Sequence, residues 1–260
     1  EKDMMDLVCK NFDKVVVVYN GANAMELGWV KDYSQIKSVI WCAGTGQSGF
    51  NALGSILCGD VNPSGRTIDT FVYDLTQTPT ANNFGNFTYT NMDEFKANAF
   101  GTDTIPAFVN YVEGIYVGYR YFNTFAPKAV AYPFGFGLSY TTFDFKDMKV
   151  ESAGDGWDVQ VTVTNTGKVN GKDVVQLYVR ALKGELDKPE RELKGFAKTK
   201  ELAPGESCTV TIHIAESSLA SYNEKTSRWE TDPGKYVFMA SKDASDCQLK
   251  KAVKVGGTAR

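Results

Sequence analysis

The sequence predicts a chain of two parts: a partial α/β sandwich with an incomplete, largely parallel sheet, followed by an all-β sandwich. The first part contains short apolar runs without polar alternation, which is typical of strands covered on both faces. The second part contains runs of period-two alternation separated by turn residues, which indicates antiparallel strands with one buried face. We place the parts at residues 1–75 and 142–260, with a connector over residues 76–141.

In residues 1–75, segments with helical spacing alternate with the apolar runs. The expected helices lie in "MMDLVCKNF", "GANAMELGWVKDYSQI" and "GQSGFNALGSILCGD", and Gly59 is expected to end the third. The expected strands are "KVVVVYN", "KSVIWCAG" and, after the "NPSG" turn, "RTIDTFVYD". Because parallel sheets need more strands than this, we interpret the region as the second half of an α/β domain whose first half lies outside the chain. The alternative is a small irregular α/β unit capped by the segment that follows.

The connector, residues 76–141, is rich in loops and aromatic residues. Its segment "FVNYVEGIYVGYRYFNTF" carries seven aromatics in eighteen residues. So many exposed rings would be costly, and we expect them to pack on a neighbouring body, either the α/β part or an absent domain. The stretch "AYPFGFGLSYTTFDF" then joins the two parts, with glycines that let the backbone turn among the rings.

Residues 142–260 have the pattern of a two-sheet antiparallel sandwich. Several short strands in so short a region match an immunoglobulin-like or fibronectin type III-like module, although the Cys…Trp…Cys pattern of true immunoglobulin domains is missing. Turn chemistry separates the strands, as in "NTGKVNGK", "LAPGES" and "TDPGK". The clearest expected strands are "WDVQVTVTNTG", "KDVVQLYVRAL", "SCTVTIHI" and "KYVFMASK".

The composition restricts the partners and the chemistry. A net charge of −3 over 260 residues gives no basic footprint for nucleic acid and no polybasic patch for a membrane, and no apolar run approaches the roughly 18 residues of a membrane span. The single histidine, His213, lies in an alternating run and is expected to be a strand residue, which disfavours a Ser–His–Asp triad. Five scattered cysteines suggest free thiols rather than a metal site, and they favour the cytoplasm over secretion: Cys9, Cys42, Cys58, Cys208 and Cys247.

Several motifs then occur in a familiar order, and the chain resembles the C-terminal part of a glycoside hydrolase family 3 enzyme of the β-glucosidase type. The resemblance covers essentially the whole chain, and "GFGLSYTTF" ahead of a fibronectin type III-like module is its most specific feature. The other motifs are "VIWCAGTGQSGFNALGSILCGDVNPSGRTIDTF", "YVEGIYVGYRYF", "VTNTGKVNGKDVVQLYV", "RELKGFAKTKELAPGES" and "SRWETDPGKYVFMAS".

The resemblance implies retaining hydrolysis of terminal, non-reducing β-linked sugars by two carboxylates, with oligo- or aryl-β-glycosides as substrates and no metal or organic cofactor. It also implies two missing partners, a (β/α)8-like barrel and the first half of the α/β domain, on the same or a companion polypeptide. The sandwich module favours the glucosidase or xylosidase type over N-acetylhexosaminidases. The particular sugar, the linkage and the origin of the chain as a fragment stay unassigned.

Neither catalytic position of the family has a counterpart in this chain, so we predict no catalytic residue here and expect the chain alone to be inactive. Position 48, where many relatives carry a Glu, is Ser48, which we interpret as a loop difference. The chain's own candidate carboxylates are expected to be surface charges or loop anchors: Glu26, Asp69, Asp74 and Glu113. The alternative function is a non-catalytic carbohydrate-binding or structural module, which would line up aromatic rings in an exposed groove.

Overall fold

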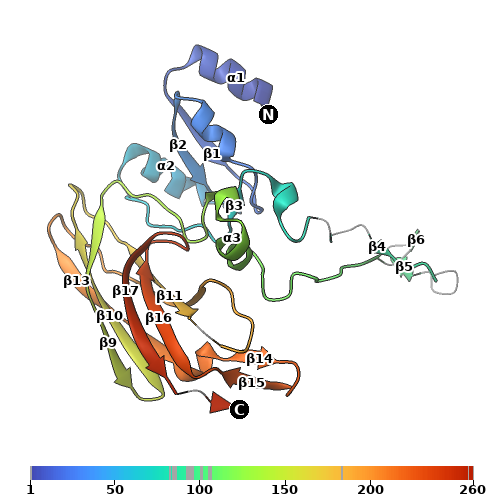
Figure 1. Cartoon of the computed structure of the whole chain (residues 1–260). Helices are drawn as coiled ribbons and strands as arrows, with labels where there is room; N and C mark the ends of the chain where they lie inside the picture. The colour runs from blue at the N-terminus through green and yellow to red at the C-terminus, as the bar shows by residue number, and fades with distance from the viewer. Residues whose placement is uncertain are drawn as a thin grey trace.

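The computed structural model describes residues 2–81, 83, 87–91, 97–99, 102–104, 107–182, 184–256 and 258–259. Figure 1 shows a small α/β region at the N-terminal end, a larger β-sandwich below it, and a thin arm that leaves the body to one side. Within the described residues, no helix has both the length and the apolar character that crossing a bilayer requires.

The N-terminal region is built on two parallel strands. Its elements are α1 (Lys2–Asn11), β1 (Val15–Tyr19), the 3-10 helix η1 (Gly28–Asp32), β2 (Ile36–Trp41) and α2 (Phe50–Cys58). β1 pairs with β2 in parallel, as the two apolar runs predicted, and the described part of this sheet contains no further strand. Helix α2 ends at Gly59, whose φ of 83° and N–H bonds to the last turn confirm it as the stop.

The third expected strand of this region has a different partner. β3 is only two residues long (Phe71–Val72) and pairs antiparallel with β8 (Val130–Tyr132), so it does not extend the β1–β2 sheet. Both side chains of β3 are fully buried, and the ring of Phe71 meets that of Trp41 edge-on at 5.1 Å. The position of β3 is therefore decided by its burial against β8, at the end of the connector. Two apolar residues in the sequence cannot specify such a partner.

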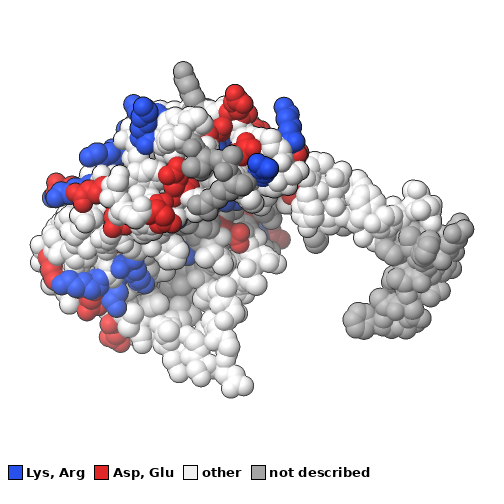
Figure 2. Space-filling view, turned by 90° about the horizontal axis from the view of Figure 1, so that it is seen from below, with Lys and Arg blue, Asp and Glu red and all other residues white. Residues whose placement is uncertain are grey.

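Between β3 and β8 the chain makes an excursion and then returns. The outgoing part holds η2 (Leu75–Gln77) and two short antiparallel pairs, β4 (Phe87–Thr88) with β7 (Ala107–Phe108) and β5 (Ala97–Ala99) with β6 (Thr102–Thr104). The return holds α3 (Tyr119–Phe125) and η4 (Pro127–Ala129). Figures 1 and 2 both show the β4–β7 region well away from the rest of the protein, and its described part carries few charged side chains.

The C-terminal region is an antiparallel two-sheet sandwich. One sheet has the order β13-β10-β9 and the other β12-β11-β16-β17, with a small β14-β15-β18 sheet at one end. The strands are β9 (Phe143–Ala153), β10 (Gly156–Asn165), β11 (Val174–Ala181), β12 (Glu192–Lys198), β13 (Ser207–Ala215), β14 (Ser221–Asn223), β15 (Arg228–Thr231), β16 (Gly234–Ser241), β17 (Cys247–Val255) and β18 (Thr258–Ala259). The 3-10 helix η5 (Glu216–Leu219) follows β13.

The core of the sandwich follows the alternation of the sequence. Along β10 every second side chain is buried, and Trp157 reaches the facing sheet, where its ring meets Phe238 at 5.7 Å. The four clearest predicted strands are β10, β11, β13 and β16. Strands β9, β12 and β17 were not predicted, and each lies at the edge of its sheet, as does the predicted β13. Edge strands carry charged side chains on their open side, which weakens the apolar pattern.

Candidate functional site

The junction between the two regions brings together segments that are far apart in the sequence. Asn62, from the "NPSG" turn, holds both sides of it: its amide donates to the carbonyl of Asn170 at 2.8 Å. Its side-chain oxygen accepts from the Ser139 hydroxyl at 2.9 Å and from the backbone N–H of Tyr140 at 2.8 Å. One asparagine thus links the α/β region, the "GFGLSY" stretch and a loop of the sandwich.

The same turn is joined to the connector by a short ladder of hydrogen bonds. The Thr67 N–H donates to the carbonyl of Phe136, and the Gly135 N–H donates to the carbonyl of Thr67, both at 2.8 Å. Gly137 lies so close to Gly65 that a Cβ at position 137 would stand 2.4 Å from the Gly65 carbonyl oxygen. A side chain there cannot be accommodated, which explains one glycine of the "GFGL" stretch.

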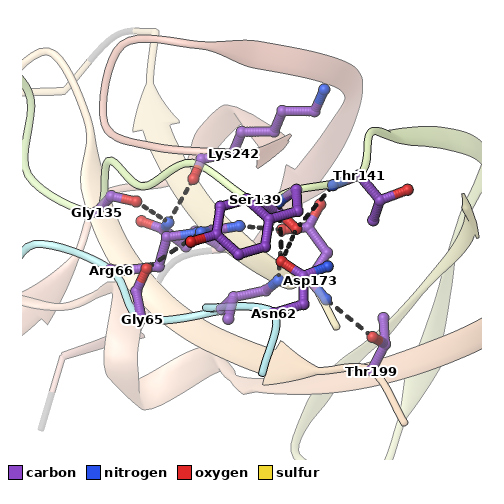
Figure 3. Close-up of polar contacts among 12 residues, drawn as sticks. Asn62, Gly65, Arg66, Gly135, Ser139, Thr141, Asp173, Thr199 and Lys242 are labelled. Atoms are coloured by element: carbon purple, nitrogen blue, oxygen red, sulfur yellow. Dashed lines mark hydrogen bonds and ion pairs between the residues drawn. The ribbon is translucent and has the colours of Figure 1, made fainter. Parts of the chain in front are cut away.

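An ion pair between Arg66 and Asp173 lies at the centre of the junction (Figure 3). The side chain of Asp173 is 2% exposed and that of Arg66 is 13% exposed. Asp173 also accepts from the N–H of Val174 at 2.8 Å, while its own N–H donates to the Thr199 hydroxyl at 3.0 Å. The carboxylate is therefore almost fully desolvated, and Arg66 supplies its cation from the other region of the chain.

A second buried contact connects the connector to the sandwich core. The Gln176 amide donates to the carbonyls of Gly135 at 2.9 Å and Lys242 at 2.5 Å, and its oxygen accepts from the Tyr178 hydroxyl at 2.8 Å. Gly135 has a φ of 81°, and a Cβ there would stand 2.0 Å from the Gln176 side-chain oxygen. Burial raises the pKa of Tyr178 far above its ordinary value, so the hydroxyl stays a donor.

Asn165 fixes the loops on the sandwich side of the junction. Its side chain is fully buried, and its amide donates to the carbonyls of Val169 and Leu202, both at 2.8 Å. Its oxygen accepts from the Thr141 hydroxyl at 2.7 Å and from the N–H of Gly167 at 3.0 Å. Every polar contact of the junction described so far is a fixed donor–acceptor pair, so the arrangement holds two bodies in register rather than moving protons.

Two of the four candidate carboxylates, Glu26 and Asp74, bind backbone N–H groups of one turn. Glu26 accepts a hydrogen bond from the N–H of Leu75 at 2.8 Å. Asp74, the preceding residue, caps η2 by accepting from the N–H of Thr76 at 2.9 Å and from its hydroxyl at 2.6 Å, and these bonds lower the pKa of Asp74. The structure thus brings Glu26 and Asp74 to the same turn, where both act as anchors.

The other two carboxylates are not part of that turn. Desolvation raises the pKa of Asp69. One oxygen of Glu113 is buried and has no hydrogen-bond partner among the described residues. None of the hydrogen bonds that the described residues make joins two of these four acids.

His213 lies on the surface of the sandwich, on β13, as its alternating run predicted. Its Nδ1 is 2.8 Å from Asp158 and its Nε2 is 3.1 Å from Asp155, and hydrogen bonds to these two carboxylates raise the pKa of the imidazole. Asp158 lies directly opposite His213 in the β10–β13 pair. With both nitrogens engaged, this histidine is a surface clamp and not a general base.

One cavity of the sandwich contains a buried cation but is too small for a sugar. It holds about 10 Å³ and is lined in part by Lys188, Leu219 and Tyr236. That volume fits a single water, whereas ligand pockets hold hundreds of Å³. Burial lowers the pKa of Lys188, whose ammonium donates to the Ser221 hydroxyl at 2.5 Å. Lys188 therefore supports the loop ahead of β12 rather than a ligand.

Comparison with known proteins assigns the family. Residues 1–140 match the glycosyl hydrolase family 3 C-terminal domain. The chain belongs to glycosyl hydrolase family 3. Residues 173–244 match the fibronectin type III-like domain, which confirms the nature of the C-terminal sandwich predicted from its strands.

The relatives are much longer than this chain. It is 39% identical to beta-glucosidase A of Butyrivibrio fibrisolvens over 96% of this chain and 30% of that protein. It is 35% identical to an exo-alpha-(1->6)-L-arabinopyranosidase of Bifidobacterium breve over 91% of this chain and 28% of the relative. Beta-glucosidase 3B of Thermotoga neapolitana matches in structure with a TM-score of 0.85 and 34% identity, over 100% of this chain and 34% of the other. The family 3 chain therefore spans about a third of such relatives.

Sequence reasoning singled out the right motifs but missed the residues that join them. The "NPSG" turn was expected only as a turn, and nothing in the sequence paired Arg66 with Asp173, 107 residues away. The motif "VTNTGKVNGKDVVQLYV" did contain a signal: Asp173 directly precedes an apolar strand, where an acid is buried only with a partner.

Proposed function

We propose that this chain is the C-terminal portion, without the nucleophile, of a retaining β-glycosidase that hydrolyses terminal, non-reducing β-linked sugars. The catalytic carboxylates belong to sequence outside the chain. The chain completes the α/β domain and supports the substrate cleft from the side, and by itself it is inactive. Domain boundaries at residues 75 and 141 belong to the same proposal.

The observation that carries the proposal is the coverage. Nearly the whole chain aligns with relatives of which it makes up about 30%. Two of the three relatives named above are beta-glucosidases, and one is an arabinopyranosidase. All three relatives are named as glycosidases, but for different sugars, so the proposal does not specify which sugar is cleaved.

The carboxylates of the described structure support this proposal. A retaining glycosidase needs two carboxyl groups about 5–5.5 Å apart across an open cleft. Glu26 and Asp74 instead anchor one turn through the N–H groups of Leu75 and Thr76. Acids that hold the backbone cannot also swing onto a substrate without breaking that turn.

The uncovered face of the β1–β2 sheet supports a missing half of the α/β domain. Helix α1 covers one face, where Met5 and Cys9 pack on Val15. On the other face Val16 is 46% exposed and Val18 is 39% exposed. A continuous apolar run such as "VVVV" is typical of a strand that is buried on both faces of its sheet. We therefore assign the exposed face of β1 to contact with the polypeptide that is absent here.

The test is the intact mass of the native protein together with hydrolysis of a nitrophenyl β-glucoside. We expect a mass well above 28.6 kDa with activity, and no activity from the 260-residue chain alone. Hydrolysis by a lone 28.6 kDa species would overturn the assignment of the catalytic pair. A lone inactive species that binds oligosaccharides in titration would favour the carbohydrate-binding module instead.

A further inference from the structure

The part of the connector from β4 to Val117 exposes a set of large apolar side chains, which we call the aromatic arm. Tyr111 is 74% exposed and Val112 is 68% exposed. The other members are the half-buried Phe87 and four residues that are each between 38% and 48% exposed, Tyr89, Phe108, Ile115 and Val117. Figure 1 shows that the β4–β7 part of the arm lies far from both the α/β region and the sandwich.

The arm has an ordered aromatic cluster but no body of its own. The rings of Phe87 and Phe108 stack at 5.4 Å, and the ring of Tyr89 meets Phe108 at 5.1 Å. The underlying β4–β7 pair is two residues long on each strand, and isolated hairpins are at best marginally stable in water. The cluster therefore needs another surface to hold it.

Two aromatic residues of α3, in contrast to those of the arm, pack against the rest of the chain. Phe122 is only 2% exposed. Tyr119 stacks on Phe134 at 4.9 Å and accepts a hydrogen bond from the N–H of Leu193 at 2.9 Å. The seven-aromatic stretch thus divides: Tyr119 and Phe122 pack on the body of this chain, Tyr116 meets Phe125 at 4.7 Å, and Tyr111 stays 74% exposed.

The charges of the arm indicate the kind of surface it fits. Between residues 76 and 117 the sequence has four acids and one lysine. One of the acids, Glu113, has a buried oxygen without a hydrogen-bond partner among the described residues. Buried carboxylate oxygens in native proteins are paired, and an unpaired one is costly. This oxygen is covered by the chain itself and cannot face a partner, so the exposed side chains of the arm define the complementary surface, which is apolar and not acidic.

We propose that the aromatic arm packs on the part of the polypeptide that precedes this region in the longer family 3 enzymes, as a second attachment separate from the open face of β1. This inference rests on the proposed function, because it needs that longer polypeptide. The length outside the chain, about two thirds of each relative, is ample for such a body. A second copy of this chain fits less well, because its net charge is −3 and the arm is itself acidic.

The experiment is hydroxyl-radical footprinting of the native enzyme as purified, compared with the 260-residue chain. Tyr89 and Tyr111 report on the arm, and Val18, which is 39% exposed on the open face of β1, reports on the α/β region. Tyr222 and Trp229 are the internal controls, since both are about half exposed on the β14–β15 hairpin of the sandwich. We expect the arm tyrosines and Val18 to lose most of their oxidation in the native enzyme, and the controls to keep theirs.

The outcomes separate this inference from the proposed function. If Val18 loses its oxidation while Tyr111 stays fully oxidised, the arm contact is overturned and the proposed function stands. No loss at either residue, in a native protein of 28.6 kDa, would overturn both. Loss at Tyr111 in the 260-residue chain alone, rising with concentration together with a doubled mass, would assign the arm to a second copy and overturn the inference.

A matched pair of variants of the native enzyme tests the contact directly. Val112→Asp places a charge in the centre of the arm, and Val169→Asp makes the same change at an exposed valine of the sandwich. We expect Val112→Asp alone to restore the oxidation of Tyr111 and to lower the melting temperature. Equal behaviour of the two variants would refute the contact, and the unchanged oxidation of Trp229 shows that the sandwich remains folded.

Discussion

Replacing Arg66 with methionine removes the cation of the junction while keeping most of its volume. Asp173 is then left 2% exposed with only the N–H of Val174 as a donor to its carboxylate. Breaking a buried pair from one side costs about 3–5 kcal/mol, and we expect about 3 kcal/mol because the 13% exposure of Arg66 admits some water. This is a large fraction of the stability of a typical domain.

The measurement is urea unfolding of the 260-residue chain, followed by the fluorescence of the tryptophans. The decisive comparison is a cycle of Arg66→Met, Asp173→Asn and the double variant. We expect the double variant to lose only about 1 kcal/mol, because an asparagine still accepts from the Val174 N–H and carries no unpaired charge. Lys200→Met is the control, since its pair with Glu206 at 2.6 Å lies on the surface and its loss should not be measurable.

Two results would refute this reasoning. A loss below about 1 kcal/mol for Arg66→Met would mean that Asp173 is hydrated in the folded chain. A double variant as unstable as the sum of the single variants would mean that the two side chains act independently. Either result would leave the backbone ladder of Thr67 and Gly135 as the main connection between the two regions.

Three further predictions concern single residues. Because the pKa of His213 is raised in the folded chain, its ion pairs stabilise the fold fully below the ordinary pKa near 6.5, and this stabilisation is lost as pH rises through the folded pKa. NMR titration of this single histidine should show the raised pKa, and Asp158→Asn should lower it. Asn165→Ala should cost the sandwich about 3 kcal/mol in urea unfolding, because the Val169 carbonyl, the Thr141 hydroxyl and the Gly167 N–H lose their partner and the Leu202 carbonyl keeps only the Gly171 N–H. A loss under about 1 kcal/mol would show that water replaces the amide. The exposed Cys58 should react with a thiol reagent long before the buried Cys9, and equal rates would show that α1 opens readily.

The period of the sequence determined the local structure. Four valines in succession gave a parallel strand, and alternation from Trp157 onwards gave a strand with one buried face, because the side-chain direction repeats every second residue. Gly59 ended a helix because only glycine adopts a positive φ without strain. The order of the motifs also predicted the family, since their spacing is a property of the chain and not of its folding.

Only the tertiary structure decided which segments meet. Nothing local distinguishes Phe122, which is buried, from Phe125, which is 58% exposed on the same helix, because the difference lies in what packs against each ring. The pairing of Arg66 with Asp173 and the use of Glu26 to hold Leu75 join residues 107 and 49 positions apart. A sequence pattern records the face that a residue takes on its own element, but the partner of that face is chosen by burial and hydrogen bonding across the whole fold.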